Sequence, residues 1–143
     1  MKKNFGQAIG VDIVEIKRFI RTTKRWGNGF LQKIYTRREL AYANSKRFPY
    51  QHLAARFAAK EAIFKALGEV EREFVGWRNV EIVNDAYGKP AVFWHGKAED
   101  TRKKRGLKGA VVSLSHTENY AVATAMLVFD KNSTPRRIVK KRP

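Results

Sequence analysis

Apolar residues recur along this chain with two different periods, and each change of period marks the start of a new element. Within Ala8–Ile13, Ile9, Val11 and Ile13 alternate with small or polar residues, which predicts a short buried strand. From Ile13 onward apolar residues recur every three or four positions, which predicts a helix. Asp12 is therefore expected where the strand ends, beside small residues that leave room around its carboxylate.

Two shorter helical segments are predicted after a break at Trp26–Gly29. Phe30–Tyr35 has the pattern of a short helix. Thr36 is a candidate N-cap for the next helix, and Glu39, three residues later, completes the pattern of a capping box. This helix is expected to end near Asn44, before a basic loop.

The most apolar helix is predicted from about Gln51 to Leu67. Apolar residues occupy nearly all of its sides, so the helix is expected to be buried. Gly68 marks its end, because glycine tolerates positive φ. Two charged pairs spaced four residues apart interrupt the apolar surface: Arg56 with Lys60, and Glu61 with Lys65.

The second half of the chain is predicted to be mainly β. Its expected elements are an acidic loop at Glu69–Gly76, strands at Asn79–Val83 and Ala91–Trp94, a charged helix at Lys97–Arg105, and strands at Gly109–His116 and Tyr120–Phe129. Turn-forming residues separate the strands of each pair, which indicates two hairpins, the second of them central. The order of elements predicts one α+β domain over residues 1–129, with antiparallel hairpins on the long central helix and a basic tail at 130–143.

Composition narrows the class of protein. The 143 residues are 43% apolar, as in an ordinary globular domain. The absence of cysteine excludes disulfides and thiolate zinc sites, and it fits a cytoplasmic protein. No apolar run approaches the ~20 residues that a membrane span requires. The N-terminus lacks the features of a signal peptide.

The net charge of +17 predicts a polyanionic partner. Nucleic acid, an anionic membrane, a phosphate-rich cofactor and an acidic protein all satisfy this charge. A basic nucleic-acid-binding domain without enzymatic activity is therefore the alternative function. The chain contains no recognisable nucleic-acid-binding motif, and this alternative leaves the carboxylates described next without a role.

Asp12 and Glu61 are the strongest candidates for chemistry. Neither common nucleotide-binding loop is present, and the three histidines lack the spacing of metal ligands. Two carboxylates with lysines nearby suit Mg²⁺, which one or two carboxylates usually hold together with substrate phosphates and water. Two structural interpretations remain open: Asp12 as a helix N-cap with Glu15, and Glu61 as the ion-pair partner of Lys65.

His116 is a further candidate at the end of a predicted strand. Its neighbour Ser115 resembles a nucleophile beside its base, but adjacent strand residues point to opposite faces, so the two cannot form a hydrogen-bonded pair. A structural role for this histidine at a strand end is as consistent with the sequence as a functional one.

Three stretches together resemble the motif set of the holo-[acyl-carrier-protein] synthases, which are 4′-phosphopantetheinyl transferases of fatty-acid synthesis. They are Ile9–Phe19 (IGVDIVEIKRF), Arg56–Gly68 (RFAAKEAIFKALG) and Ser113–Ala125 (SLSHTENYAVATA). The YGKP segment at residues 87–90 is also similar. The resemblance covers about Ile9–Val128. The break at Trp26–Gly29 and the tail match no motif and inherit no role.

The resemblance implies transfer of the 4′-phosphopantetheine arm of coenzyme A to a serine of apo acyl carrier protein, with release of adenosine 3′,5′-bisphosphate. It implies Asp12 and Glu61 as Mg²⁺ ligands, with Lys65 in reach of the diphosphate as the third catalytic residue. Further candidates for coenzyme A binding are Lys46, Arg47, Arg56, Lys60 and His116. For the serine proton, the sequence does not choose between a metal-bound water and a carboxylate as acceptor. The family forms homotrimers with active sites between subunits.

The resemblance also assigns a purpose to the basic first helix. Acyl carrier proteins are acidic, so this helix is the expected docking surface, through Arg18, Arg21, Lys24 and Arg25. The alternative is a solvated basic face. Two other readings concern the family: a related transferase serving polyketide or peptide synthases, which is typically about twice as long, and an inactive structural subunit.

Overall fold

The computed structural model describes residues 6–68 and 75–130. Most of the predicted acidic loop at Glu69–Gly76, and the predicted tail after residue 130, lie outside the described residues. The elements are β1 (Gln7–Glu15), α1 (Ile16–Trp26), α2 (Asn28–Ile34), α3 (Arg37–Asn44), α4 (Pro49–Leu67), the 3₁₀ turn η1 (Trp77–Asn79), β2 (Val80–Asn84), β3 (Pro90–Trp94), α6 (Gly96–Lys104), β4 (Leu107–His116) and β5 (Tyr120–Phe129).

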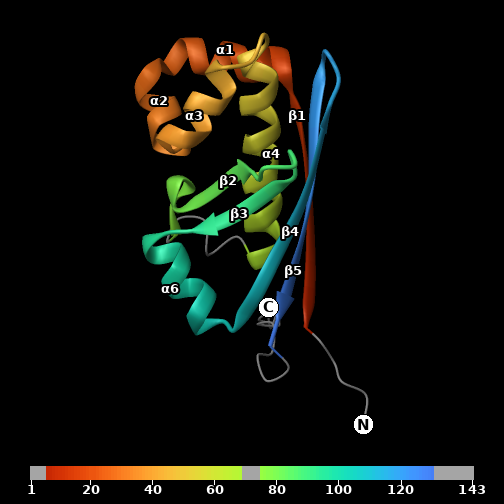
Figure 1. The fold of residues 1–143 in the computed structure, drawn as a ribbon. Coiled ribbons are helices and arrows are strands. Elements are labelled where there is room, and N and C mark those ends of the chain that lie inside the picture. The colour runs from red at the N-terminus through yellow and green to blue at the C-terminus, as the bar shows by residue number, and fades with distance from the viewer. Residues whose placement is uncertain (1–5, 69–74, 131–143) are drawn as a thin grey trace, which may run out of the picture.

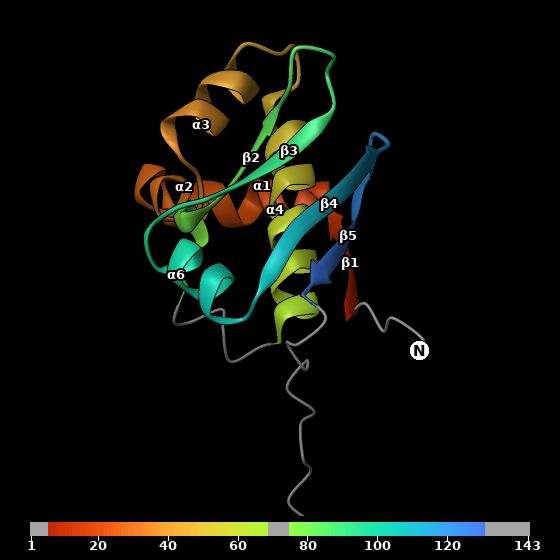
Figure 2. The same ribbon diagram turned by 60° about the horizontal axis from the view of Figure 1, so that its bottom comes forward.

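The strands form two antiparallel sheets, one with the order β1-β5-β4 and the other made by β2 and β3. Helix α4 lies along one face of the three-stranded sheet, with the β2–β3 hairpin and helices α1 to α3 on its other side (Figure 1). Helix α6 follows the hairpin and packs against η1, β3 and β4 (Figure 2). The predicted α+β fold, with hairpins packed on a long central helix, is confirmed.

Small side chains allow α4 to lie close to the sheet. The helix contributes fully buried alanines, and β5 presents alanines to it at alternate positions: Ala54, Ala58, Ala59 and Ala62 from α4, and Ala121, Ala123 and Ala125 from β5. At Gly10 of β1 the approach is closest, because an added Cβ would lie 1.9 Å from the carbonyl oxygen of Ala62. Asp12 is two residues after Gly10 on the strand, and Glu61 is next to Ala62 on the helix. The contact between Gly10 and Ala62 therefore places Asp12 and Glu61 near each other.

Several local predictions are confirmed. Thr36 caps α3 by accepting from the Glu39 backbone N–H, and the Glu39 carboxylate completes the capping box by accepting from the Thr36 backbone N–H. Gly68 ends α4 with φ +107°. Strand β5 has the predicted bounds, and it is the central strand of its sheet.

The junction between β1 and α1 differs from the prediction. Strand β1 continues to Glu15, because it pairs with β5 until Glu15 lies opposite Tyr120. Asp12 therefore lies within the strand, and its interpretation as an N-cap is wrong: Glu15 holds that position without a side-chain capping bond. The alternating apolar residues of β1 do share one face, but that face is exposed rather than buried; Ile9, Val11 and Ile13 are 76%, 55% and 65% exposed.

Candidate active site

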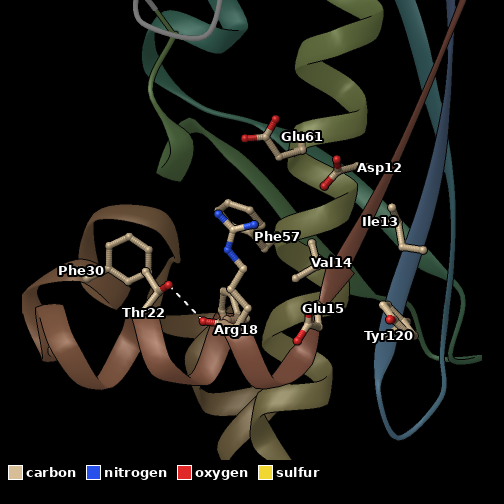
Figure 3. A pocket seen from close by; sticks show the side chains of 11 residues that line it. Asp12, Ile13, Val14, Glu15, Arg18, Thr22, Phe30, Phe57, Glu61 and Tyr120 are labelled. Atoms are coloured by element: carbon tan, nitrogen blue, oxygen red, sulfur yellow. Dashed lines mark hydrogen bonds between the residues drawn. The ribbon is translucent and has the colours of Figure 1, made fainter.

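Asp12 and Glu61 line one pocket of about 540 Å³ between β1, α1 and α4 (Figure 3). We call it the first pocket; its lining residues are Asp12, Ile13, Val14, Glu15, Arg18, Phe19, Thr22, Phe30, Phe57, Glu61 and Tyr120. The two carboxylates come from separate elements and lie near each other at one end of this pocket. The structure thus brings together the pair that the sequence singled out.

Lys65 lies beside Asp12. Its ammonium donates to Asp12 Oδ1 at 2.9 Å and to the carbonyl oxygen of Val11 at 3.0 Å. The side chain crosses from α4 to β1 and remains partly exposed. Two carboxylates and one cation therefore meet at the edge of the pocket, and the cation holds the Asp12 carboxylate in place.

The remaining lining of the first pocket is largely apolar and includes Phe57 from α4 and Phe30 from α2. Arg18 extends from α1 towards Phe57 and lines the pocket (Figure 3). Arg18 is exposed, like the other predicted docking residues Arg21, Lys24 and Arg25, and its spacing of three and seven residues from Arg21 and Arg25 puts the three arginines on one side of α1. Sequence periodicity did not reveal that Arg18 lines the pocket.

A second pocket, of about 390 Å³, contains other predicted residues. It is lined by Tyr42, His52, Ala55, Arg56, Asn84, Gly88, Lys89, Pro90, Val111, Val112, Ser113, Leu114 and His116. Lys46 lies next to it, with its ammonium 4.8 Å from the centre of the Tyr42 ring. Arg47 instead packs over Phe48, 5.2 Å from that ring, and does not line the pocket.

Arg56 is a fixed, buried cation at the wall of the second pocket. Its Nε donates to the carbonyl oxygen of Ile82, and one terminal nitrogen donates to Asn84 Oδ1, each at 3.2 Å. The guanidinium lies 4.1 Å from the centre of the Tyr42 ring. Burial lowers the pKa of Arg56 from its usual value, while nearby Tyr42 and Glu39 oppose this shift.

Lys60 does not reach either pocket. Its side chain is 0% exposed, and its ammonium donates to Glu39 Oε2 at 2.9 Å and to the carbonyl oxygens of Ile34 and Trp77. Burial lowers the pKa of Lys60, and the charge of Glu39 opposes that shift. All three donors of the ammonium are occupied, so the expected contact with a coenzyme A phosphate has no geometric basis. Lys60 instead joins α4 to α2, α3 and η1.

Tyr42, His52 and Lys89 line the second pocket but were not among the sequence-predicted site residues. For His52 a signal was present, because it lies one helical turn before Arg56 and so on the same side of α4. Tyr42 could not be found this way, since α3 meets α4 only in the folded chain.

Two features are absent from the described residues. None of the described helices is both long and apolar enough to cross a membrane. Within residues 6–68 and 75–130, no group of three or more histidine or acidic side chains forms a ready-made metal cage.

A family model and the most similar relatives that we compared point to the same protein family. A family model described as the 4′-phosphopantetheinyl transferase superfamily matches residues 8–125. A holo-[acyl-carrier-protein] synthase of Geotalea daltonii is 48% identical over 122 residues, which are 85% of this chain and 96% of that protein.

Solved structures of proteins with the same name are also similar. The enzyme from Neisseria meningitidis is 38% identical with a TM-score of 0.78, over 84% of this chain and 96% of that one. The Bacillus anthracis structure, in complex with CoA (3′,5′-ADP), is 29% identical with a TM-score of 0.69, over 86% and 96%.

Proposed function

The chain belongs to the 4′-phosphopantetheinyl transferase superfamily, and we propose that within it the protein is a holo-[acyl-carrier-protein] synthase. It transfers 4′-phosphopantetheine from coenzyme A to a serine of apo acyl carrier protein and releases adenosine 3′,5′-bisphosphate. One observation carries this proposal: Asp12 and Glu61 line the same pocket, and Lys65 contacts Asp12 beside it. A relative named holo-[acyl-carrier-protein] synthase matches most of the chain. We further propose that the protein acts in fatty-acid synthesis, which the resemblance supports, and in the cytoplasm, which fits its lack of cysteine.

The residues of the first pocket fit Mg²⁺. Asp12 and Glu61 supply the hard oxygen ligands that this ion prefers, and two carboxylates suffice when substrate phosphates and water complete the shell. A bound Mg²⁺ supplies neutralisation of the charge on a diphosphate. Lys65 already contacts Asp12, so it keeps that carboxylate oriented and adds a second positive charge for the diphosphate.

The charge and shape of the first pocket suit a reaction in which the protein mainly positions the two substrates for transfer of the phosphopantetheine group. Phe30 and Phe57 give the pocket apolar walls beside its two carboxylates. Arg18 lines the same pocket and extends from α1 towards Phe57. It is placed to hold an anionic group, either a phosphate or an acidic side chain of the carrier protein.

We assign the coenzyme A phosphates that lie outside the diphosphate to the second pocket. Arg56 and His116 line it from α4 and β4, and Lys46 lies at its edge. Arg47, which packs over Phe48, is a weaker member of this set. Lys60 is left out because its ammonium is fully occupied inside the protein.

An exposed apolar face supports assembly of this chain with copies of itself. Opposite the face that covers α4, the three-stranded sheet has two partly apolar rows: Ile9, Met126 and Val111, and Ile13, Val122 and Ser115. All six side chains are exposed. Exposed apolar side chains gathered on one face of a sheet are typical of an interface, and the family resemblance supports a homotrimer as the assembly.

The two pockets lie at opposite edges of this face. The first pocket includes Ile13 on edge strand β1, and the second includes Val111 on edge strand β4; they share no lining residue. A head-to-tail ring brings the β1 edge of one subunit towards the β4 edge of the next. Each complete active site then combines a metal-binding pocket with the neighbouring subunit's phosphate-binding pocket.

Docking of acyl carrier protein is assigned to α1. Arg21, Lys24 and Arg25 are exposed there, beside the first pocket that Arg18 lines. A basic surface next to the reaction site suits an acidic helical partner.

The test is mass spectrometry of apo acyl carrier protein incubated with coenzyme A, Mg²⁺ and this protein. A mass gain of one phosphopantetheine on the carrier serine, with adenosine 3′,5′-bisphosphate released in equal amount, is the expected result. An unchanged carrier would contradict the proposal. The nucleic-acid-binding alternative receives no support from the relatives.

A further inference from the structure

Three aromatic rings cross the wall of the second pocket from α3 to β4. Tyr42 and His52 meet edge-on, with ring centres 5.7 Å apart and planes at 81°. His52 and His116 also meet edge-on, at 5.5 Å and 70°. His52 is therefore the middle ring, and it touches a side chain from each neighbouring element.

Positive charges lie beside this row of rings. The guanidinium of Arg56 lies 4.1 Å and the ammonium of Lys46 4.8 Å from the centre of the Tyr42 ring, and Lys89 lines the pocket from the β2–β3 turn. None of the residues that line this pocket is acidic. The pocket thus offers cations and two imidazoles to a ligand, with no negative charge in its lining to compete.

The pKa of His52 lies below its ordinary value. Partial burial is the main cause, and the charges of Arg56 and Lys46 and the neighbouring His116 add to it. His52 is therefore neutral near pH 7 when the pocket is empty. An anion in the pocket reverses the local charge and favours the protonated ring.

We propose that His52 is a proton-linked positioning residue: it holds the His116 ring towards the second pocket and takes up a proton when a phosphate dianion binds there. The inference rests on the proposed function, because that function supplies the dianion, a phosphate of coenzyme A. His52 acts through His116 and Tyr42, which it contacts, and through its charge. Nothing in the motif resemblance assigns it a role.

Proton uptake and phosphate binding then strengthen each other. A proton that binds more tightly in the complex makes the ligand bind more tightly at low pH, and the coupling is the same in both directions. Each proton taken up contributes at most about a tenfold change in Kd per pH unit. Affinity for the phosphate ligand therefore rises as the pH falls from about 8 to about 6.

Isothermal titration of adenosine 3′,5′-bisphosphate into the full-length protein tests this coupling. Runs in buffers of different ionisation enthalpy count the protons taken up. His52→Phe keeps an aromatic ring and removes the titrating group, so we expect nearly the wild-type Kd at about pH 8 and a smaller gain in affinity at about pH 6. The ligand's own phosphates titrate near pH 6, but this contribution is common to both proteins.

His52→Ala separates positioning from charge. Loss of the ring leaves His116 without its edge contact, so we expect binding to weaken about threefold or more at both pH values. Equal affinity of His52→Ala and wild type would overturn the positioning role. Proton uptake by His52→Phe equal to that of wild type would overturn the proton linkage.

NMR titration of the wild-type imidazoles provides the same test without a variant. The pKa of His52 should rise when adenosine 3′,5′-bisphosphate is added, and an unchanged value would contradict the proposal. Binding of the ligand by the wild-type protein separates the proposed function from the role of His52. If the wild-type protein does not bind the ligand, the assignment of the second pocket in the proposed function is wrong. If the ligand binds without a proton on His52, only the present inference is wrong.

Discussion

Asp12, Glu61 and Lys65 place two negative charges and one positive charge at the first pocket. Their arrangement depends on single atoms: Lys65 contacts Oδ1 of Asp12 and a backbone carbonyl of the same strand. We therefore expect activity to depend on the charge and hydrogen bonding of these three side chains more than on their volume.

Glu61→Gln tests the ligand role, because it keeps the shape of the side chain and removes its charge. We expect transfer at limiting Mg²⁺ to fall about 100-fold or more, with thermal stability close to wild type. Glu15→Gln is the matched control: it removes a carboxylate from the same pocket that has no assigned role. Near-normal turnover by Glu61→Gln would return Glu61 to the ion-pair interpretation.

The sequence predicted the contacts of a side chain when its partners are near in the chain. It did not predict contacts that depend on how the elements pack. The capping box of Thr36 and Glu39 needs only four consecutive residues, and it forms as predicted. Arg56 and Lys60 are four residues apart and so lie on the same side of α4. Arg56 nevertheless lines a pocket, whereas Lys60 is enclosed by three elements. Periodicity fixes their relative direction on α4 but not the layer that each one meets.

At the scale of elements, the contact between β1 and α4 sets the geometry of the first pocket. Gly10 allows the helix carbonyl at Ala62 to lie against the strand. The sequence showed small residues beside Asp12, but the end of the strand depended on pairing with β5, which local periodicity does not report. The apolar face of β1 was predicted as one face, and whether it is buried depends on neighbours outside this chain segment.

Gly10→Ala should disturb this contact, because the new methyl group meets backbone atoms that cannot rotate away. We expect the free energy of unfolding to fall by about 1–3 kcal/mol and activity to fall further, as Asp12 and Glu61 move apart. Gly109→Ala is the control: it is also a strand glycine, but an added Cβ has no atom within 4 Å. Chemical denaturation of the two variants measures the difference, and equal stability of both would contradict the close contact.

The basic face of α1 gives a second prediction at this scale. Arg21→Glu with Arg25→Glu should raise the KM for acyl carrier protein about tenfold at low salt and leave the KM for coenzyme A nearly unchanged. Added salt should weaken the wild type towards the variant, since the charges are exposed.

Reversal of Lys103 and Lys104 on α6 changes the net charge by the same amount at exposed positions on another helix. A rise in the KM for carrier protein of similar size in this control would show that net charge, rather than α1, attracts the partner. In that case α1 is a solvated basic face.

For the whole molecule, the two pockets lie at opposite edges of one sheet and share no lining residue, an arrangement that suits the proposed sharing of active sites between subunits. The α+β fold was predictable because each element has a clear period, and the motif resemblance covered nearly all of it. Separation of the two pockets was not predictable, since it depends on the strand order β1-β5-β4. The claim that follows is that neighbouring subunits share each active site.

Mixing two inactive variants tests this claim most directly. One carries Glu61→Gln in the first pocket, and the other carries Lys46→Ala with His116→Ala at the second. After subunit exchange at a one-to-one ratio, about a quarter of the junctions in a closed ring pair an intact first pocket with an intact second pocket. We therefore predict that the mixture recovers up to about a quarter of wild-type transfer, measured by mass spectrometry of the carrier protein. A mixture no more active than the sum of its two parents would contradict the shared active site.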